Sequence, residues 1–110
     1  MHSALYDRAE IFLMQDRTTE AQRDLQKLVD DGVEHWVVYF RLAELYAQQR
    51  EGTLFEQNLL QAIRYGFSLH LLLESGEKWK HYVSDPIIQE HLYRIIQLYG
   101  DEKIWESLQQ

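Results

Sequence analysis

The sequence predicts an all-α protein whose helical hairpins stack as a short α-solenoid, and three observations support this fold class. First, the pattern of residues 5–33 returns 34 positions later as residues 39–67. Second, apolar residues in both copies recur at steps of three and four, as on one face of an amphipathic helix. Third, a glycine stands at the same place in each copy, Gly32 and Gly66, where helices often end in a left-handed residue. A fixed period of this length is the sequence sign of stacked helical hairpins.

Each copy predicts two helices joined by a short turn. In the first copy we expect helices over 4–15 and from Thr18 or Thr19 to Gly32, with Ser3 and a threonine as N-caps. In the second copy we expect helices over 36–49 and 53–65, the latter opened by a Thr53–Glu56 capping box. Turns this short make the two helices of a pair antiparallel neighbours.

The pattern weakens after Gly66. Short helices are expected over 69–73, after a Ser68 cap, and over 77–83. Asp85-Pro86 is a strong helix start, and the helix that follows should run to Tyr99. Gly100 lies a further 34 positions after Gly66, which suggests a third unit whose first helix is broken; Asp101 would then cap a last helix over 102–108. Five aliphatic residues should face inward and pack on the helix over 53–65: Ile87, Ile88, Leu92, Ile95 and Ile96.

The chain resembles the tetratricopeptide repeat family, whose unit is a helix-turn-helix of about 34 residues. The residues that carry the resemblance are Leu5, Ala9, Phe12, Ala21, Leu25 and Leu28 in the first unit, and Tyr39, Ala43, Tyr46, Phe55, Leu59 and Ala62 in the second. The small residue lets two helices approach closely, and the aromatic fills the gap beside it. We therefore expect one domain over 1–110, with repeats over 3–33 and 36–67 and a divergent third unit or cap over 68–110.

Composition excludes several classes of function. The formal net charge of −7, from 18 acidic and 11 basic residues, argues against nucleic-acid binding and against an anionic membrane surface. No cysteine is present, so disulfides and thiolate chemistry are excluded. The N-terminal segment up to Asp30 lacks the apolar core of a signal peptide, and no apolar run is long enough to span a bilayer. A cytoplasmic location is the expectation.

No constellation for catalysis stands out. Glu77 and His81 share helical spacing, and His91 follows ten positions later, but three convergent metal ligands with a base are not indicated. Glu10 and Glu44 occupy equivalent positions and could do acid–base work, although a solvated helix face is the simpler interpretation. We expect no enzyme, no cofactor and no metal site.

The family resemblance implies a concave groove along the first helix of each unit. Eight residues would line it, and we refer to them together as the predicted groove: Tyr6, Glu10, Leu13, Met14, Phe40, Glu44, Ala47 and Gln48. Tyr6 and Phe40 are turned about 100° from the core-facing positions beside them, which favours exposure. The alternative is that the C-terminal segment or a second copy covers this face.

The sequence thus predicts a protein–protein interaction module: an adaptor, a chaperone-like binder or an assembly subunit. Its partner would be a peptide or helix with apolar anchors and basic residues, bound in the predicted groove. A self-associating structural module, and hence a homo-oligomer, is the second hypothesis. A small enzyme or metal binder is the third.

Overall fold

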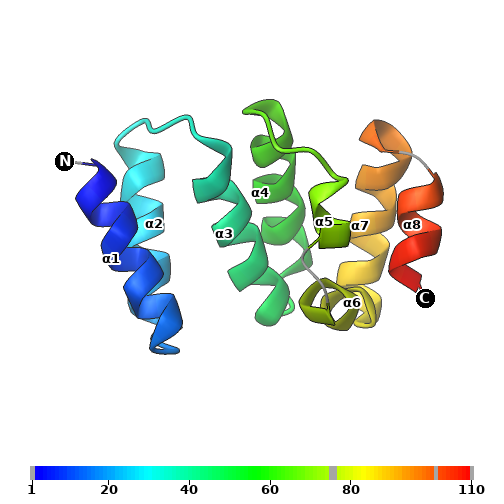
Figure 1. Ribbon diagram of the computed structural model, residues 1–110, viewed down its shortest axis with the longest axis horizontal. Helices are drawn as coiled ribbons and strands as arrows, with labels where there is room; N and C mark the ends of the chain where they lie inside the picture. The colour runs from blue at the N-terminus through cyan, green and yellow to red at the C-terminus, as the bar shows by residue number, and fades with distance from the viewer. Residues whose placement is uncertain (1, 75–76, 101, 110) are drawn as a thin grey trace.

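The computed structural model describes residues 2–74, 77–100 and 102–109, and this part of the chain forms eight α-helices and no strand (Figure 1). The helices are α1 (His2–Met14), α2 (Thr18–Asp30), α3 (Trp36–Gln48), α4 (Gly52–Arg64), α5 (Leu71–Glu74), α6 (Glu77–Val83), α7 (Pro86–Tyr99) and α8 (Glu102–Gln109). The predicted all-α class is confirmed. None of these helices is long and apolar enough to cross a membrane.

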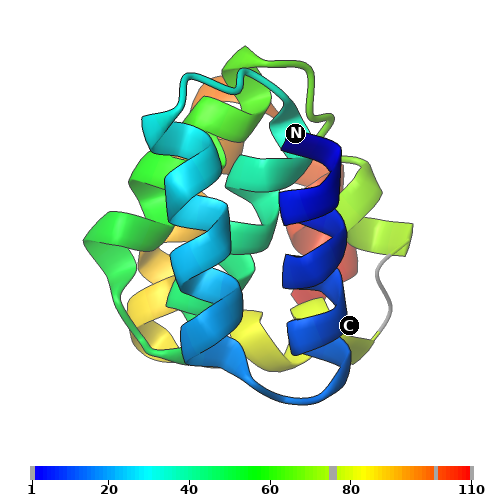
Figure 2. The same cartoon turned by 90° about the vertical axis from the view of Figure 1, so that its left-hand side faces the viewer.

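The first four helices form two antiparallel pairs, α1 with α2 and α3 with α4. The pairs pack in chain order, because α2 contacts α3 (Figures 1 and 2). The next long helix against α4 is α7, as predicted, and α8 packs on α5, α6 and α7. In Figure 1 the short helix α5 is drawn between α4 and α7, and α6 lies at the lower end of α7, which it contacts. The two ends of the chain therefore lie at opposite ends of a body 40 Å long and 26 × 23 Å across.

The repeat period is present in the backbone as well as in the side chains. Helices α1 to α4 each end in a left-handed residue; the φ values are 61° at Asp16, 86° at Gly32, 60° at Arg50 and 115° at Gly66. In each case the next amide donates to the carbonyl five positions back, at 2.8–3.1 Å, as in a Schellman motif. The sequence indicated only the two glycines, because Asp16 and Arg50 are not residues that usually mark this conformation.

Several predicted N-caps are wrong. Helix α2 begins at Thr18 with Arg17 in the cap position, and α4 begins at Gly52 after Glu51; neither has a side-chain cap. Ser3 lies inside α1, so it does not cap that helix. Asp85 is confirmed as the cap of α7: its carboxylate accepts a hydrogen bond from the Ile87 amide at 2.9 Å.

The C-terminal part follows the prediction less closely. Helix α5 begins two residues later than expected, at Leu71. Gly100 has φ of −112°, so it does not repeat the left-handed helix ends of the first two units. The predicted Asp101 cap lies outside the described residues. Of the five aliphatic residues expected inward on α7, four are buried, but Ile87 is 39% exposed because it lies in the first turn of the helix.

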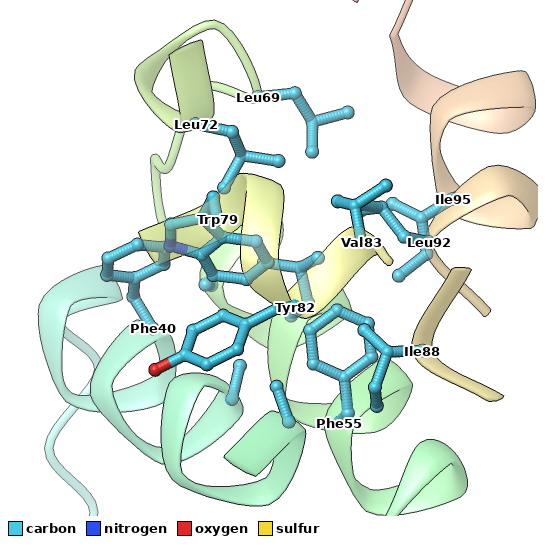
Figure 3. Packing of buried hydrophobic residues seen from close by; sticks show 14 of the residues in the cluster. Phe40, Phe55, Leu69, Leu72, Trp79, Tyr82, Val83, Ile88, Leu92 and Ile95 are labelled. Carbon is cyan, nitrogen blue, oxygen red and sulfur yellow. The ribbon is translucent and has the colours of Figure 1, made fainter. Parts of the chain in front are cut away.

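Two apolar clusters hold the helices together. The smaller joins α1, α2 and α3 through Ala9, Leu25, Leu28, Val38, Leu42 and Leu45. The larger joins α3 and α4 to the four C-terminal helices and includes Phe40, Phe55 and Trp79 (Figure 3). Aliphatic residues of α7 complete it, so the C-terminal segment covers an apolar face that α4 would otherwise expose.

Gly52 allows the close approach of α4 and α7. A Cβ atom added there would lie 2.5 Å from His91 Nε2 and 2.9 Å from Ile87 Cγ2. The His91 ring cannot easily move away, because its Nδ1 lies 2.6 Å from Glu56 Oε1. We therefore expect Gly52→Ala to lower the free energy of unfolding by about 1–3 kcal/mol, measured by urea denaturation.

Thr53→Ala is the matched control for that substitution. Thr53 is exposed and does not cap α4, so its replacement should change stability by less than about 0.5 kcal/mol. A larger loss for Thr53→Ala than for Gly52→Ala would contradict both the helix start and the packing at Gly52.

An ion pair between the first two helices predicts a pH dependence. Arg8 donates two hydrogen bonds, of 2.7 and 2.8 Å, to the carboxylate of Asp24, which is 4% exposed. These bonds lower the pKa of Asp24, although burial opposes them. The pKa of Asp24 in the folded protein therefore lies below its pKa in the unfolded chain, which is about 3.9. Above this unfolded pKa the ionised carboxylate stabilises the fold, and the stabilisation is lost as the pH falls through the folded pKa.

Asp24→Asn should therefore reduce the loss of stability on acidification below about pH 4. Arg8→Met should reduce it in the same way, because it removes the main cause of the shift. The measurement is the urea midpoint as a function of pH for the wild type and both variants. Parallel curves for all three proteins would show that this pair does not contribute.

Candidate functional site

The predicted groove has one half on α1 and the other on α3, and an ion pair joins the two helices. Tyr6, Glu10 and Leu13 on α1 are partly buried, and Met14 is 85% exposed. On α3, Gln48 is exposed, but three residues of the set are buried: Phe40, Glu44 and Ala47. Arg41 of α3 connects the halves, because its guanidinium contacts Glu10 Oε1 at 2.9 Å and Glu44 Oε1 at 2.8 Å.

Helix α6 fills the α3 half of the predicted groove. Its Trp79 stacks on Phe40 with ring centroids 5.7 Å apart (Figure 3). Lys78 Nζ lies 3.2 Å from Glu44 Oε2. The hydroxyl of Tyr82 accepts a hydrogen bond from Gln48 Nε2 at 2.8 Å.

The expectation that Phe40 is exposed is therefore wrong. Phe40 is 7% exposed, between Trp79 on one side and Phe67, whose ring centroid is 4.6 Å away, on another. As the helical spacing indicates, Phe40 does not belong to the cluster that α3 forms with α1 and α2. Residues from later in the chain cover it instead. The alternative of coverage by the C-terminal segment holds for this half of the groove.

Glu44 is the most constrained charge in the groove. It is 4% exposed and contacts two cations, Arg41 and Lys78. A buried carboxylate needs such partners, because desolvation without them is strongly unfavourable. Burial tends to lower the pKa of Arg41, but the hydrogen bond to Glu44 and the charges of Glu44 and Glu10 outweigh it and raise that pKa.

Tyr6 belongs to the same network at its α1 end. Burial raises the pKa of its hydroxyl, and the neighbouring Glu10 carboxylate raises it further, whereas Arg41 acts in the opposite direction. Tyr6 therefore stays neutral at physiological pH and presents a partly buried ring beside a charged pair.

The remaining open surface consists of two adjoining clefts. The first, about 250 Å³, lies between α1, α3 and α6; five members of the predicted groove line it, namely Glu10, Leu13, Met14, Glu44 and Gln48. The second, about 580 Å³, lies between α3 and α6 and is lined by Ala47, Gln48 and His81, by the cations Arg50 and Lys78, and by the carboxylates Glu77 and Asp85. Gln48 and Lys78 belong to both clefts.

Sequence reasoning missed Arg41, Lys78 and Tyr82. Arg41 stands three positions before Glu44, a spacing at which opposite charges meet on a helix, so it could have been found. Lys78 and Tyr82 lie in the segment after Gly66, where the 34-residue pattern is weak. The sequence therefore could not predict that these two residues contact α3.

Within residues 2–74, 77–100 and 102–109, no group of three His, Asp or Glu side chains is arranged to hold an ion. His91 instead lies between Glu56, at 2.6 Å, and Arg94, at 2.9 Å, where it joins α4 to α7.

Comparisons of this chain with protein-family models, with curated proteins and with solved structures found no match.

Proposed function

We propose that this chain is a protein–protein interaction module of tetratricopeptide type, and that a peptide or helix binds in the open, α1 half of its groove. Two features support the tetratricopeptide assignment. The left-handed helix ends recur at one repeat period, at Asp16 and Arg50 and again at Gly32 and Gly66. The small residues Ala9 and Ala43 are fully buried at equivalent places in the two hairpins.

The observation that carries the binding proposal is the cleft between α1, α3 and α6. Met14 and Leu13 offer apolar contact there, and Met14 is 85% exposed. Three carboxylates, Glu10, Asp16 and Glu44, line the same cleft with two cations, Arg41 and Lys78, so the charge of its lining is net negative. The fitting partner is an apolar side chain with a Lys or Arg beside it, which an amphipathic helix or a short peptide can present.

The way α6 binds the other half supports this choice of partner. Trp79 is an aromatic anchor against Phe40, and the adjacent Lys78 pairs with Glu44. The chain thus fills half of the groove with an aromatic anchor and a lysine, and the open half offers similar chemistry. Such a module would act in the cytoplasm, because a chain without cysteine has no disulfide bond that reducing conditions could break.

Site-specific photo-crosslinking tests the proposal. A photoreactive phenylalanine analogue replaces Met14 in the native host, and the same analogue replaces the exposed Glu106 of α8 as a control. We expect protein adducts from position 14 that are absent from position 106. Equal adducts from both positions, or none from either, would contradict a partner in this cleft.

Self-association is the second candidate, and exposed apolar residues on α7 favour it. Leu98 is 71% exposed, Tyr99 62% and Tyr93 41%. A mass that rises with concentration in light scattering, and that Leu98→Glu returns to the monomer value, would support this candidate. A monomer at all concentrations would remove it.

A further inference from the structure

A furrow between α2 and α4 differs in chemistry from the groove. It has a volume of about 480 Å³, and none of its lining residues belongs to the two clefts beside α6. Tyr39 and Tyr46 of α3 contribute to its floor, and Tyr65 lies at the end of α4. We call this site the tyrosine furrow.

The lining of the tyrosine furrow contains no carboxylate, although the chain has 18 Asp and Glu residues. Its polar groups are amides, phenols and one guanidinium: Gln26, Gln57, Asn58 and Gln61, the three tyrosines, and Arg64. The acids Asp30 and Asp31 line only the neighbouring hollow. Each of these polar side chains carries a donor group, whereas a carboxylate can only accept a hydrogen bond. The Tyr39 hydroxyl and one amide hydrogen each of Gln26 and Asn58 already donate within the chain, so Gln57, Gln61 and Arg64 are the main donors toward a ligand.

The aromatic rings are spaced along the furrow. Tyr39 and Tyr46 stand seven residues apart on one helix, so they are separated by about 10.5 Å along its axis. Tyr39 is held in place: its ring stacks on Tyr65 with centroids 5.4 Å apart, and its hydroxyl donates to the Val33 carbonyl at 3.4 Å. Tyr46 is only partly buried, so its ring can receive a ligand.

A polyproline II helix matches both features. It rises about 3.1 Å per residue and repeats every three residues, so equivalent side chains recur at about 9.3 Å, close to the spacing of the two tyrosines. Proline has no amide hydrogen, so such a strand presents backbone carbonyls that need donors. Aromatic-lined grooves are the usual receptors of proline-rich segments.

We propose that the tyrosine furrow binds a proline-rich peptide in the polyproline II conformation. Proline rings pack on the partly buried Tyr46 and Tyr65, and Tyr39, which is only 9% exposed, supports the Tyr65 ring by stacking on it. The amides of Gln57 and Gln61, both exposed on α4, donate to the carbonyls of the peptide. This site is independent of the groove, and it would let one module hold two partners.

The test uses acetylated, amidated decaproline and isothermal titration calorimetry on the full chain. We expect the wild type to bind it, and Gln57→Glu and Gln61→Glu each to weaken binding by about tenfold, because a donor becomes an acceptor-only group facing carbonyls. Gln97→Glu, on an exposed site of α7, is the matched control and should bind like the wild type. Thermal melts verify that all three variants are folded.

Three results would overturn the proposal. The first is no binding of decaproline by the folded wild type. The second is an equal loss in all three Gln→Glu variants, which would show a general effect of charge. The third is that decaproline does not bind but an uncharged oligosaccharide such as chitohexaose does, and that Gln61→Glu abolishes this binding. The furrow would then be a sugar-binding site.

Discussion

Replacing Trp79 with alanine is expected to lower the free energy of unfolding by about 3–5 kcal/mol, the largest loss from any single residue of this chain. Trp79 is fully buried, and its ring lies among Phe40, Phe55 and Tyr82, with centroids 5.3–5.9 Å away (Figure 3). Removing the indole leaves a cavity where α3, α4 and α6 meet. Urea denaturation of the variant and the wild type measures the difference.

Two further substitutions calibrate this result. Trp105 is only partly buried and contacts one aromatic ring, that of Tyr93, with centroids 5.0 Å apart, so Trp105→Ala should lower the free energy of unfolding clearly less. Trp79→Phe should cost less than Trp79→Ala, because it retains much of the ring and removes the indole N–H, which has no partner among the described residues. A Trp79→Ala loss no greater than that of Trp105→Ala would contradict the central place of Trp79 in the core.

Removing residues 84–110 should have an even larger effect and abolish cooperative unfolding. The deletion takes away α7 and α8, which bury Ile88, Leu92 and Ile104 against the rest of the core. The apolar face of α4 that carries Phe55 would then be open to water, and a large exposed apolar surface promotes aggregation. Light scattering and a thermal melt of the truncated chain measure both consequences.

The intact chain with Tyr99→Ser is the control for that truncation. Tyr99 is 62% exposed at the end of α7, so its replacement should leave the melt nearly unchanged. A truncated chain that stays monomeric and melts cooperatively would show that α7 and α8 are an appendage rather than a cap.

The sequence predicts the helix pairs well, because their periodicity and their two glycines are local signals. The repeat period located the first four helices closely, and Asp85-Pro86 located a fifth. Capping was harder to predict. Thr18 and Thr53 stand where a cap is plausible, yet the preceding Schellman turns bring Arg17 and Glu51 to the cap positions instead.

The burial of Phe40 could not be predicted from local sequence signals. Helical spacing placed Phe40 off the core-facing stripe of its own hairpin, but whether that face meets water depends on residues far away along the chain. Helix α6 is short and lies outside the repeat, so no register could indicate that Trp79 would cover Phe40. At this position α6 contributes Trp79 against Phe40 and Lys78 against Glu44.

The placement of α6 in the α3 half of the groove is tested most directly by the fluorescence of Trp79. With Trp36 and Trp105 both replaced by phenylalanine, Trp79 is the sole tryptophan of the chain. If α6 fills the groove, the emission is that of an indole in an apolar core, acrylamide barely quenches it, and Phe40→Ala alters it. Emission typical of an indole in water, with free quenching by acrylamide in the folded protein, would contradict this placement and leave Phe40 open to a partner.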